Sequence, residues 1–126
     1  MAHFDIPLDL PHAGTITRRI MRIFEQMLDE KNDQHREMIE TAEKLDSILF
    51  DASWKGENPP PGEAEKMREQ ASEVARRLVD QIESAHIGFD RLGQCVRNLF
   101  ECLELGEEGA EISLRAGENP NSLQRP

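Results

Sequence analysis

The chain reads MREQASEVARRLVDQIESAHIGFDRLGQCVRNLFECL from Met67 to Leu103. Apolar residues recur in this stretch every three or four positions, which is the spacing of one face of an α-helix. They are Met67, Ala71, Val74, Leu78, Ile82, Ala85, Phe89, Leu92, Val96, Leu99 and Leu103. A long amphipathic helix cannot bury its own apolar face and needs a partner helix, in the same chain or in another. The stretch therefore predicts an all-α protein.

Length, composition and charge limit the classes to which the protein can belong. The 126 residues suffice for one domain. Charged residues make up 32% of the chain and aromatic residues 5%, a mixture typical of helices with long solvent-exposed faces. The formal net charge of -10 argues against nucleic acid and against anionic membranes, because both bind basic surfaces. We therefore expect no nucleic-acid partner and no membrane partner.

Prolines and glycines divide the chain into segments. Pro7 and Pro11 lie in a stretch of alternating apolar and polar residues, which predicts an extended N-terminal arm. Three prolines and two glycines between residues 53 and 62 predict a turn that joins two antiparallel helices. The last residues carry few apolar side chains and predict a flexible, disordered tail. The expected segments are an arm at 1–14, a helical hairpin domain at 15–106 with helices near 15–53 and 63–105, and a tail at 107–126.

Nine consecutive polar residues, from Asp29 to Glu37, interrupt the apolar pattern of the first helix. Either the helix continues through them, or it breaks near Asn32 and Asp33 with Asp33 as the cap of a new helix. The seven-residue phase is kept across the stretch by Ile20, Met27, Gln34, Thr41 and Ile48. This spacing favours a continuous helix. The polar residues would then face the apolar middle of the second helix and open the bundle to a partner or ligand.

The last third of the second helix is apolar on more than one side. The candidate interface residues there are Ile87, Phe89, Leu92, Val96, Leu99, Phe100 and Leu103. A hairpin of two helices also leaves about half of each apolar face in solvent. We therefore expect self-association, most simply as a dimer of hairpins that forms a four-helix bundle, or binding to a helical partner protein.

One pair of residues has a spacing that metal sites use. Glu83 and His86 are three apart and share one helix face, as in the carboxylate bundles that bind two iron ions, and Glu40 could complement them. One such pair is close to what chance gives in a chain with 25 acidic residues. We therefore assign no metal ligands and no cofactor.

The remaining reactive residue types have no catalytic arrangement. Cys95 and Cys102 lie two helical turns apart, too far for a disulfide within a straight helix, so we expect them to be buried and reduced. The sequence contains no serine elbow and no phosphate-binding glycine loop. We therefore predict no catalytic residues and no enzymatic activity.

Trp54-Lys55-Gly56 lies at the expected turn, and Phe100-Glu-Cys-Leu-Glu104 lies near the end of the second helix. On these residues the chain resembles, over residues 15–104, the WXG-motif helical hairpins exported by type VII secretion. The resemblance implies two long helices joined at the Trp-x-Gly turn, dimerisation into a four-helix bundle, and an aromatic-x-x-x-acid secretion signal. The triple proline, the high charge and the two cysteines depart from that family. A lone Trp at such a turn is expected to close the open end of the helix pair.

These patterns favour one functional class. We predict a non-enzymatic interaction, scaffold or adaptor protein that acts through an apolar helix face. The alternatives are a WXG-like exported hairpin and a ferritin-like bundle that binds metal through carboxylates and histidine. Because the chain shows neither a basic segment followed by an apolar leader nor an apolar run of about 20 residues, we expect it in the cytoplasm.

Overall fold

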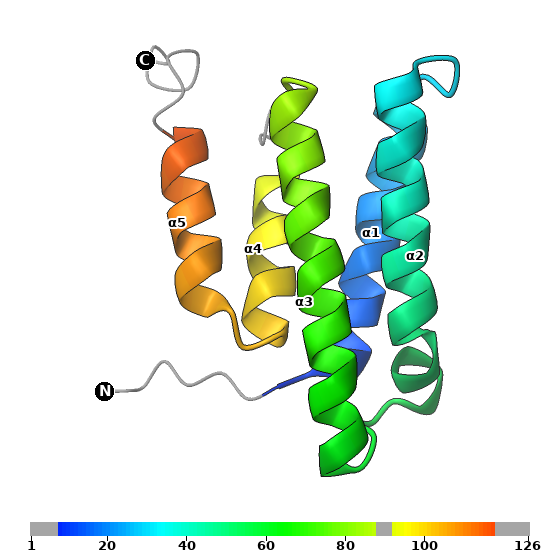
Figure 1. Ribbon diagram of the computed structural model, residues 1–126, viewed down its shortest axis with the longest axis vertical. Coiled ribbons are helices and arrows are strands. Elements are labelled where there is room, and N and C mark those ends of the chain that lie inside the picture. The colour runs from blue at the N-terminus through cyan, green and yellow to red at the C-terminus, as the bar shows by residue number, and fades with distance from the viewer. Residues whose placement is uncertain (1–7, 88–91, 118–126) are drawn as a thin grey trace.

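A computed structural model describes residues 8–87 and 92–117, of which the last five by their backbone alone. Within these ranges the protein is all-α, as predicted, with helices α1 (Leu10–Met27), α2 (Asp33–Lys55), α3 (Pro61–Ser84), α4 (Gly93–Cys102) and α5 (Gly106–Gly117). Figure 1 shows α3 in front, α2 at one edge and α5 at the other. Helix α1 packs against α2 and α4, α2 against α3, and α4 against α5. The described residues thus form one bundle of more than two helices.

Helix α1 begins inside the segment for which an extended arm was predicted. It begins at Leu10, and the Asp9 side chain accepts a hydrogen bond of 3.0 Å from the backbone N–H of His12. Pro11 is the second residue of the helix, where the N–H that proline lacks has no intrahelical acceptor in any case. The prediction that Pro11 excludes helix is therefore wrong, while residues 1–7 lie outside the described residues.

The first long helix predicted at 15–53 is two helices. Asn32 caps α2, because its side chain accepts a hydrogen bond of 3.2 Å from the backbone N–H of His35. The preceding turn is closed by Asp29, whose side chain accepts from the N–H of Lys31 at 2.9 Å. The favoured continuous helix is thus wrong and the break is correct, although Asn32 rather than Asp33 supplies the cap. The polar stretch forms a turn and the first part of α2, whereas it was predicted to lie in the middle of one continuous helix.

The connection between α2 and α3 spans residues 56–60, inside the segment predicted to turn. Gly56 has a φ of 72°, a left-handed conformation that glycine adopts without steric cost. Pro61 is the first residue of α3, where its fixed φ suits the helix.

The second long helix predicted at 63–105 also breaks. Helix α3 ends at Ser84, and His86 then adopts a left-handed φ of 59°. The N–H of Ile87 donates to the carbonyl of Ile82, and the N–H of His86 to that of Glu83, both at 3.1 Å. This pair of bonds is the Schellman ending of a helix, which turns the chain out of its axis. The three- and four-residue spacing of apolar residues continues in the sequence past the end of α3, so it gave no sign of this break.

A second ending of the same kind separates α4 from α5. Glu104 has a φ of 62°, and the N–H of Leu105 donates to the carbonyl of Phe100 at 2.7 Å. Helix α5 follows in the segment for which a disordered tail was predicted, so that prediction is wrong for residues 107–117. Ile112 is buried, because α5 packs its apolar side against α4. Residues 118–126 lie outside the described part of the chain.

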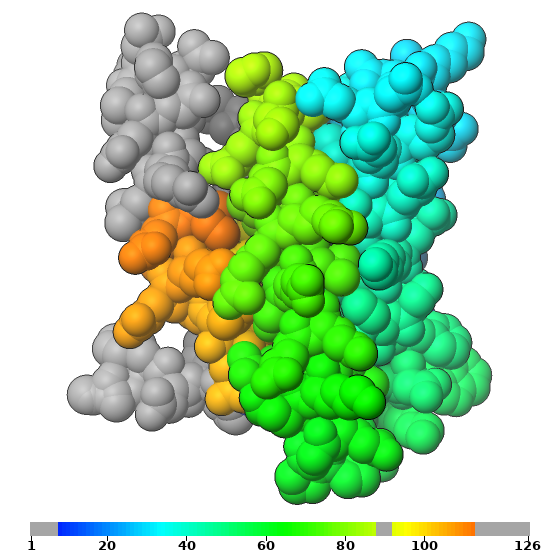
Figure 2. All heavy atoms as spheres, in the orientation of Figure 1, coloured from blue at the N-terminus to red at the C-terminus, as the bar shows by residue number. Residues whose placement is uncertain are grey.

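The core lies between the helices and is filled by side chains from all five. Its largest fully buried members are Phe24, Phe100, Leu10, Ile16, Ile20, Met38, Leu45, Leu49, Leu78, Ile82, Leu92 and Leu99. Space-filling atoms show α3 running along one face, with α2 on one side of it and α5 on the other (Figure 2). None of the helices described in the structure has an apolar window long enough to cross a membrane.

Two close helix contacts depend on glycine. A Cβ atom at Gly14 of α1 would lie 2.8 Å from the Cβ of Ser53 and 3.3 Å from the carbonyl oxygen of Leu49. A Cβ atom at Gly109 of α5 would lie 2.9 Å from the Cβ of Phe100. The missing side chains therefore allow α1 to approach α2, and α5 to approach α4.

Candidate interaction surfaces

The residues predicted to form an interface lie mostly inside the core of the single chain. Those that are buried are Leu92, Val96, Leu99, Phe100 and Leu103, each at most 2% exposed. Ile87 is half-buried, and Phe89 lies outside the described residues. Helices α1, α3 and α5 all pack against α4, so the chain itself covers this apolar surface. A partner could reach it only if one of these helices moved away.

The predicted metal pair does not share a helix face. Glu83 lies in the last turn of α3, whereas His86 lies beyond the end of that helix with a left-handed backbone. The spacing argument for this pair is therefore wrong, because it assumed a continuous helix. In the parts of the chain that the structure describes, which include Glu40, no three His, Cys, Asp or Glu side chains are grouped to hold an ion.

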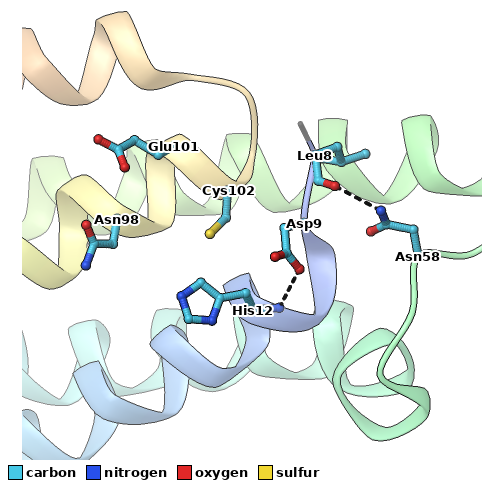
Figure 3. A pocket seen from close by; sticks show the side chains of 7 residues that line it. All are labelled: Leu8, Asp9, His12, Asn58, Asn98, Glu101 and Cys102. Carbon is cyan, nitrogen blue, oxygen red and sulfur yellow. Dashed lines mark hydrogen bonds between the residues drawn. The ribbon is translucent and has the colours of Figure 1, made fainter. Parts of the chain in front are cut away.

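An open hollow of about 560 Å³ lies where the N-terminal segment meets α4 and the α2–α3 connection (Figure 3). Asn58 holds this segment by two hydrogen bonds of 2.9 Å: its Oδ1 accepts from the N–H of Leu10, and its Nδ2 donates to the carbonyl of Leu8. The N–H of Asp9 donates to the carbonyl of Cys102, also at 2.9 Å. These bonds satisfy backbone groups at the start of α1 and fix the N-terminal segment to the bundle.

Figure 3 shows the Cys102 thiol pointing toward the Asp9 and His12 side of this hollow. Burial raises the pKa of Cys102 to about 11, with smaller contributions from the negative charges of Asp9 and Glu101. At neutral pH the thiol is therefore protonated, and a protonated thiol is a poor nucleophile. The arrangement favours a structural role for Cys102, as expected for a buried, reduced cysteine.

The largest exposed apolar side chain in the described structure is Trp54, with 77% of its surface in solvent. It stacks on Phe50, one helical turn earlier and 45% exposed, with ring centroids 6.2 Å apart and an interplanar angle of 20°. The Arg18 guanidinium of α1 lies 5.5 Å from the centre of the Phe50 ring, and its Nε is 3.2 Å from Asp46 Oδ1. We call Arg18, Asp46, Phe50 and Trp54 the aromatic patch.

Trp54 is exposed to solvent, whereas it was expected to close the open end of the helix pair. The N-terminal segment and Asn58 close this end of the bundle instead. Sequence reasoning also overlooked Phe50. The available signal was its position, since Phe50 and Trp54 are four apart and both fall outside the buried stripe of α2. That stripe comprises Met38, Ala42, Leu45, Leu49 and Ala52.

A second hollow, of about 380 Å³, lies between α1 and α2 beside the turn that joins them. Its lining comprises Met21, Phe24, Leu28 and Ile39 together with Glu25, Glu30 and Glu43. The carboxylates are exposed, and among the described residues none of the three takes part in an ion pair or hydrogen bond. The hollow therefore combines an apolar floor with three carboxylates that form no ion pair among the described residues, and we call it the acidic hollow.

No protein-family model matches the chain, and neither the curated proteins nor the solved structures include a significant match to it. The resemblance to WXG-motif hairpins thus stays a prediction. In the structure its Trp54 and Lys55 end α2, and Gly56 supplies the left-handed residue of the cap.

Proposed function

We propose that the protein is a non-enzymatic helical interaction protein whose contact surface is the aromatic patch. The observation that carries the proposal is the exposure of Trp54 and Phe50. Tryptophan and arginine are the side chains most enriched among the residues that dominate binding energy at interfaces. Burying an exposed indole and phenyl ring against a partner releases far more apolar surface from water than the other exposed side chains of α2 could.

The geometry of the patch suits a binding surface. Stacking on Phe50 and the contact of Arg18 with that ring restrict the side chains before any partner arrives. Restricted side chains lose less conformational entropy on binding, so more of the contact energy remains as affinity. The Arg18–Asp46 ion pair lies at the side of the rings, where a polar border is typical of interfaces.

The partner is either a second copy of this chain or a different helical protein. A dimer remains the simplest form of self-association. We propose the aromatic patch rather than the α4 side chains as its contact surface, because the single chain already buries most of the latter.

Size-exclusion chromatography of a native cell extract tests this function. The wild-type chain should elute well above its monomer mass of 14.4 kDa. The double variant Phe50→Ser, Trp54→Ser should elute as a monomer, since both side chains are exposed and their loss should leave the fold intact. A matched double variant on α3, Glu69→Ser with Asp80→Ser, should elute with the wild type. Co-elution of the aromatic variant with the wild type would overturn the proposal.

A further inference from the structure

The aromatic patch and the acidic hollow lie on one face of the α1–α2 pair. The α2 side chains of this face follow helical spacing and none is buried: Ile39, Glu43, Asp46, Phe50 and Trp54. Those of α1 and its C-cap residue do the same: Arg18, Met21, Glu25 and Leu28. The two rows meet at the Arg18–Asp46 ion pair and in the lining of the hollow. We call these residues, with Glu30, the outer α1–α2 face.

The two ends of this face have different chemistry. At one end, Trp54 and Phe50 offer exposed aromatic surface. At the other, Met21, Leu28 and Ile39 are half-buried around the hollow, and three carboxylates border it without a basic partner in the described residues. The hollow thus accepts apolar side chains, and its border attracts positive charge.

The length of the face indicates the shape of its occupant. Ile39 and Trp54 are 15 positions apart on α2, which corresponds to about 22 Å along a helix axis. A segment of about four helical turns has the same length. Two helices packed side by side present a shallow trough in which a third helix can place a row of apolar side chains.

We propose that the outer α1–α2 face is the docking site for one amphipathic helix of a partner protein, with lysine or arginine residues at the end that meets the acidic hollow. Apolar side chains of that helix contact Trp54 and Phe50 at one end and enter the hollow at the other. Its basic residues pair with Glu25, Glu30 and Glu43. This inference rests on the proposed function, because it uses the same aromatic patch and adds the chemistry of the partner.

A designed peptide serves as the probe. It has about 16 residues, leucines at alternating three- and four-residue spacing, lysines beside the leucines of one terminal half, and no tryptophan. Trp54 is the only tryptophan of the chain, so its fluorescence reports on this face alone. Titration of the full chain should shift the Trp54 emission to shorter wavelength as the leucines cover the indole. A second peptide with glutamate in place of lysine, and a third with the same composition in scrambled order, are the peptide controls.

Charge variants test the acidic hollow directly. The triple variant Glu25→Gln, Glu30→Gln, Glu43→Gln should weaken binding of the lysine peptide about tenfold, the combined effect of three exposed ion pairs. It should also weaken the salt dependence of binding. The matched control, Glu63→Gln, Glu69→Gln, Glu111→Gln, removes the same charge from exposed positions of α3 and α5 and should bind as the wild type does. Circular dichroism confirms that each variant is folded.

Several outcomes would overturn the docking proposal. The first is that the lysine and glutamate peptides bind with equal affinity. The second is that the two triple variants lose equal affinity for the lysine peptide. The third is that Trp54 emission does not shift at saturating lysine peptide. Binding of the scrambled peptide with the same affinity would also contradict it. If the peptides fail while the wild-type chain still assembles through Trp54 and Phe50 in cell extract, the helix-docking inference fails and the proposed function stands. If the partner found there is a second copy of this chain, the face is a homodimer surface instead.

Discussion

The backbone N–H of Ile87 donates to the carbonyl oxygen of Ile82 at 3.1 Å, across the point where α3 ends. His86, which lies between them in the chain, adopts a left-handed backbone with a φ of 59° so that this bond can form. Residues with a Cβ atom are destabilised in this conformation by about 1–2 kcal/mol relative to glycine. A histidine thus performs the role that glycine has in most helix endings of this type.

Replacing His86 by glycine should stabilise the protein. The variant removes the steric cost of the left-handed backbone, and we expect the free energy of unfolding to rise by about 1 kcal/mol. Urea denaturation followed by circular dichroism measures the change. Ala85→Gly is the matched control, because Ala85 has an ordinary right-handed φ of -83° and should gain nothing from glycine. A gain at Ala85 equal to that at His86 would contradict the backbone explanation.

Gly14→Ala should destabilise the bundle, because its Cβ would lie 2.8 Å from that of Ser53. Overpacking of a tight contact typically costs about 1–3 kcal/mol. Gly62→Ala provides the comparison, since a Cβ atom there meets nothing within 4 Å and alanine favours helix by up to about 1 kcal/mol. In thermal unfolding, the melting temperature of Gly14→Ala should be lower than that of the wild type, and that of Gly62→Ala should be equal or higher. Equal effects of the two alanines would show that α1 and α2 are not closely packed.

Asn58→Ala should weaken the attachment of the N-terminal segment. It removes both hydrogen bonds to the backbone of Leu8 and Leu10, and we expect a loss of about 1–3 kcal/mol of stability. Asn98→Ala removes a half-buried amide whose Oδ1 accepts a hydrogen bond from Gln94 Nε2 on the same helix, and its effect should be much smaller. Hydrogen exchange adds a local readout, because the amide of Leu10 should exchange faster in the Asn58 variant. An unchanged Leu10 amide would exclude the role given to Asn58.

The raised pKa of Cys102 predicts a loss of stability in alkali. The folded thiol titrates near pH 11 and the unfolded thiol near the ordinary value of 9.0, so the folded state binds more protons between these values. Stability contributed by this group is therefore complete below pH 9 and decreases as the pH rises toward 11. Denaturant midpoints measured across this range should fall more steeply for the wild type than for Cys102→Ala. Parallel slopes would show that burial does not shift this thiol.

Sequence periodicity predicted which residues are helical more successfully than where the helices end. Most of the described residues in the apolar stripe from Met67 onward lie in α3 and α4, but His86, which follows the end of α3, carries no glycine or proline signal. A break near Asn32 and Asp33, with Asp33 as the cap, was the alternative that the preserved heptad phase outweighed. That phase was misleading because α1 and α2 pack against each other after the turn as two separate helices.

The interaction surface was also difficult to predict from the sequence. An apolar face that seemed too wide for one partner helix is covered by α1, α3 and α5, and the sequence could not show this while α5 was expected to be disordered. The N-terminal segment is held by Asn58, through a contact between residues about 50 positions apart. Such a contact has no local signal in the sequence.

Site-specific photo-cross-linking in the native cell tests the role of the aromatic patch most directly. A photoreactive phenylalanine derivative, which keeps an aromatic ring at the contact, replaces Trp54 in one chain and the exposed Asp80 of α3 in another. Position 54 should give one discrete cross-linked product and position 80 none, and adding Phe50→Ser should abolish the product at position 54. The mass of the product then distinguishes a second copy of the chain from a different protein. No product at position 54, equal products at both positions, or a product unaffected by Phe50→Ser would contradict the account.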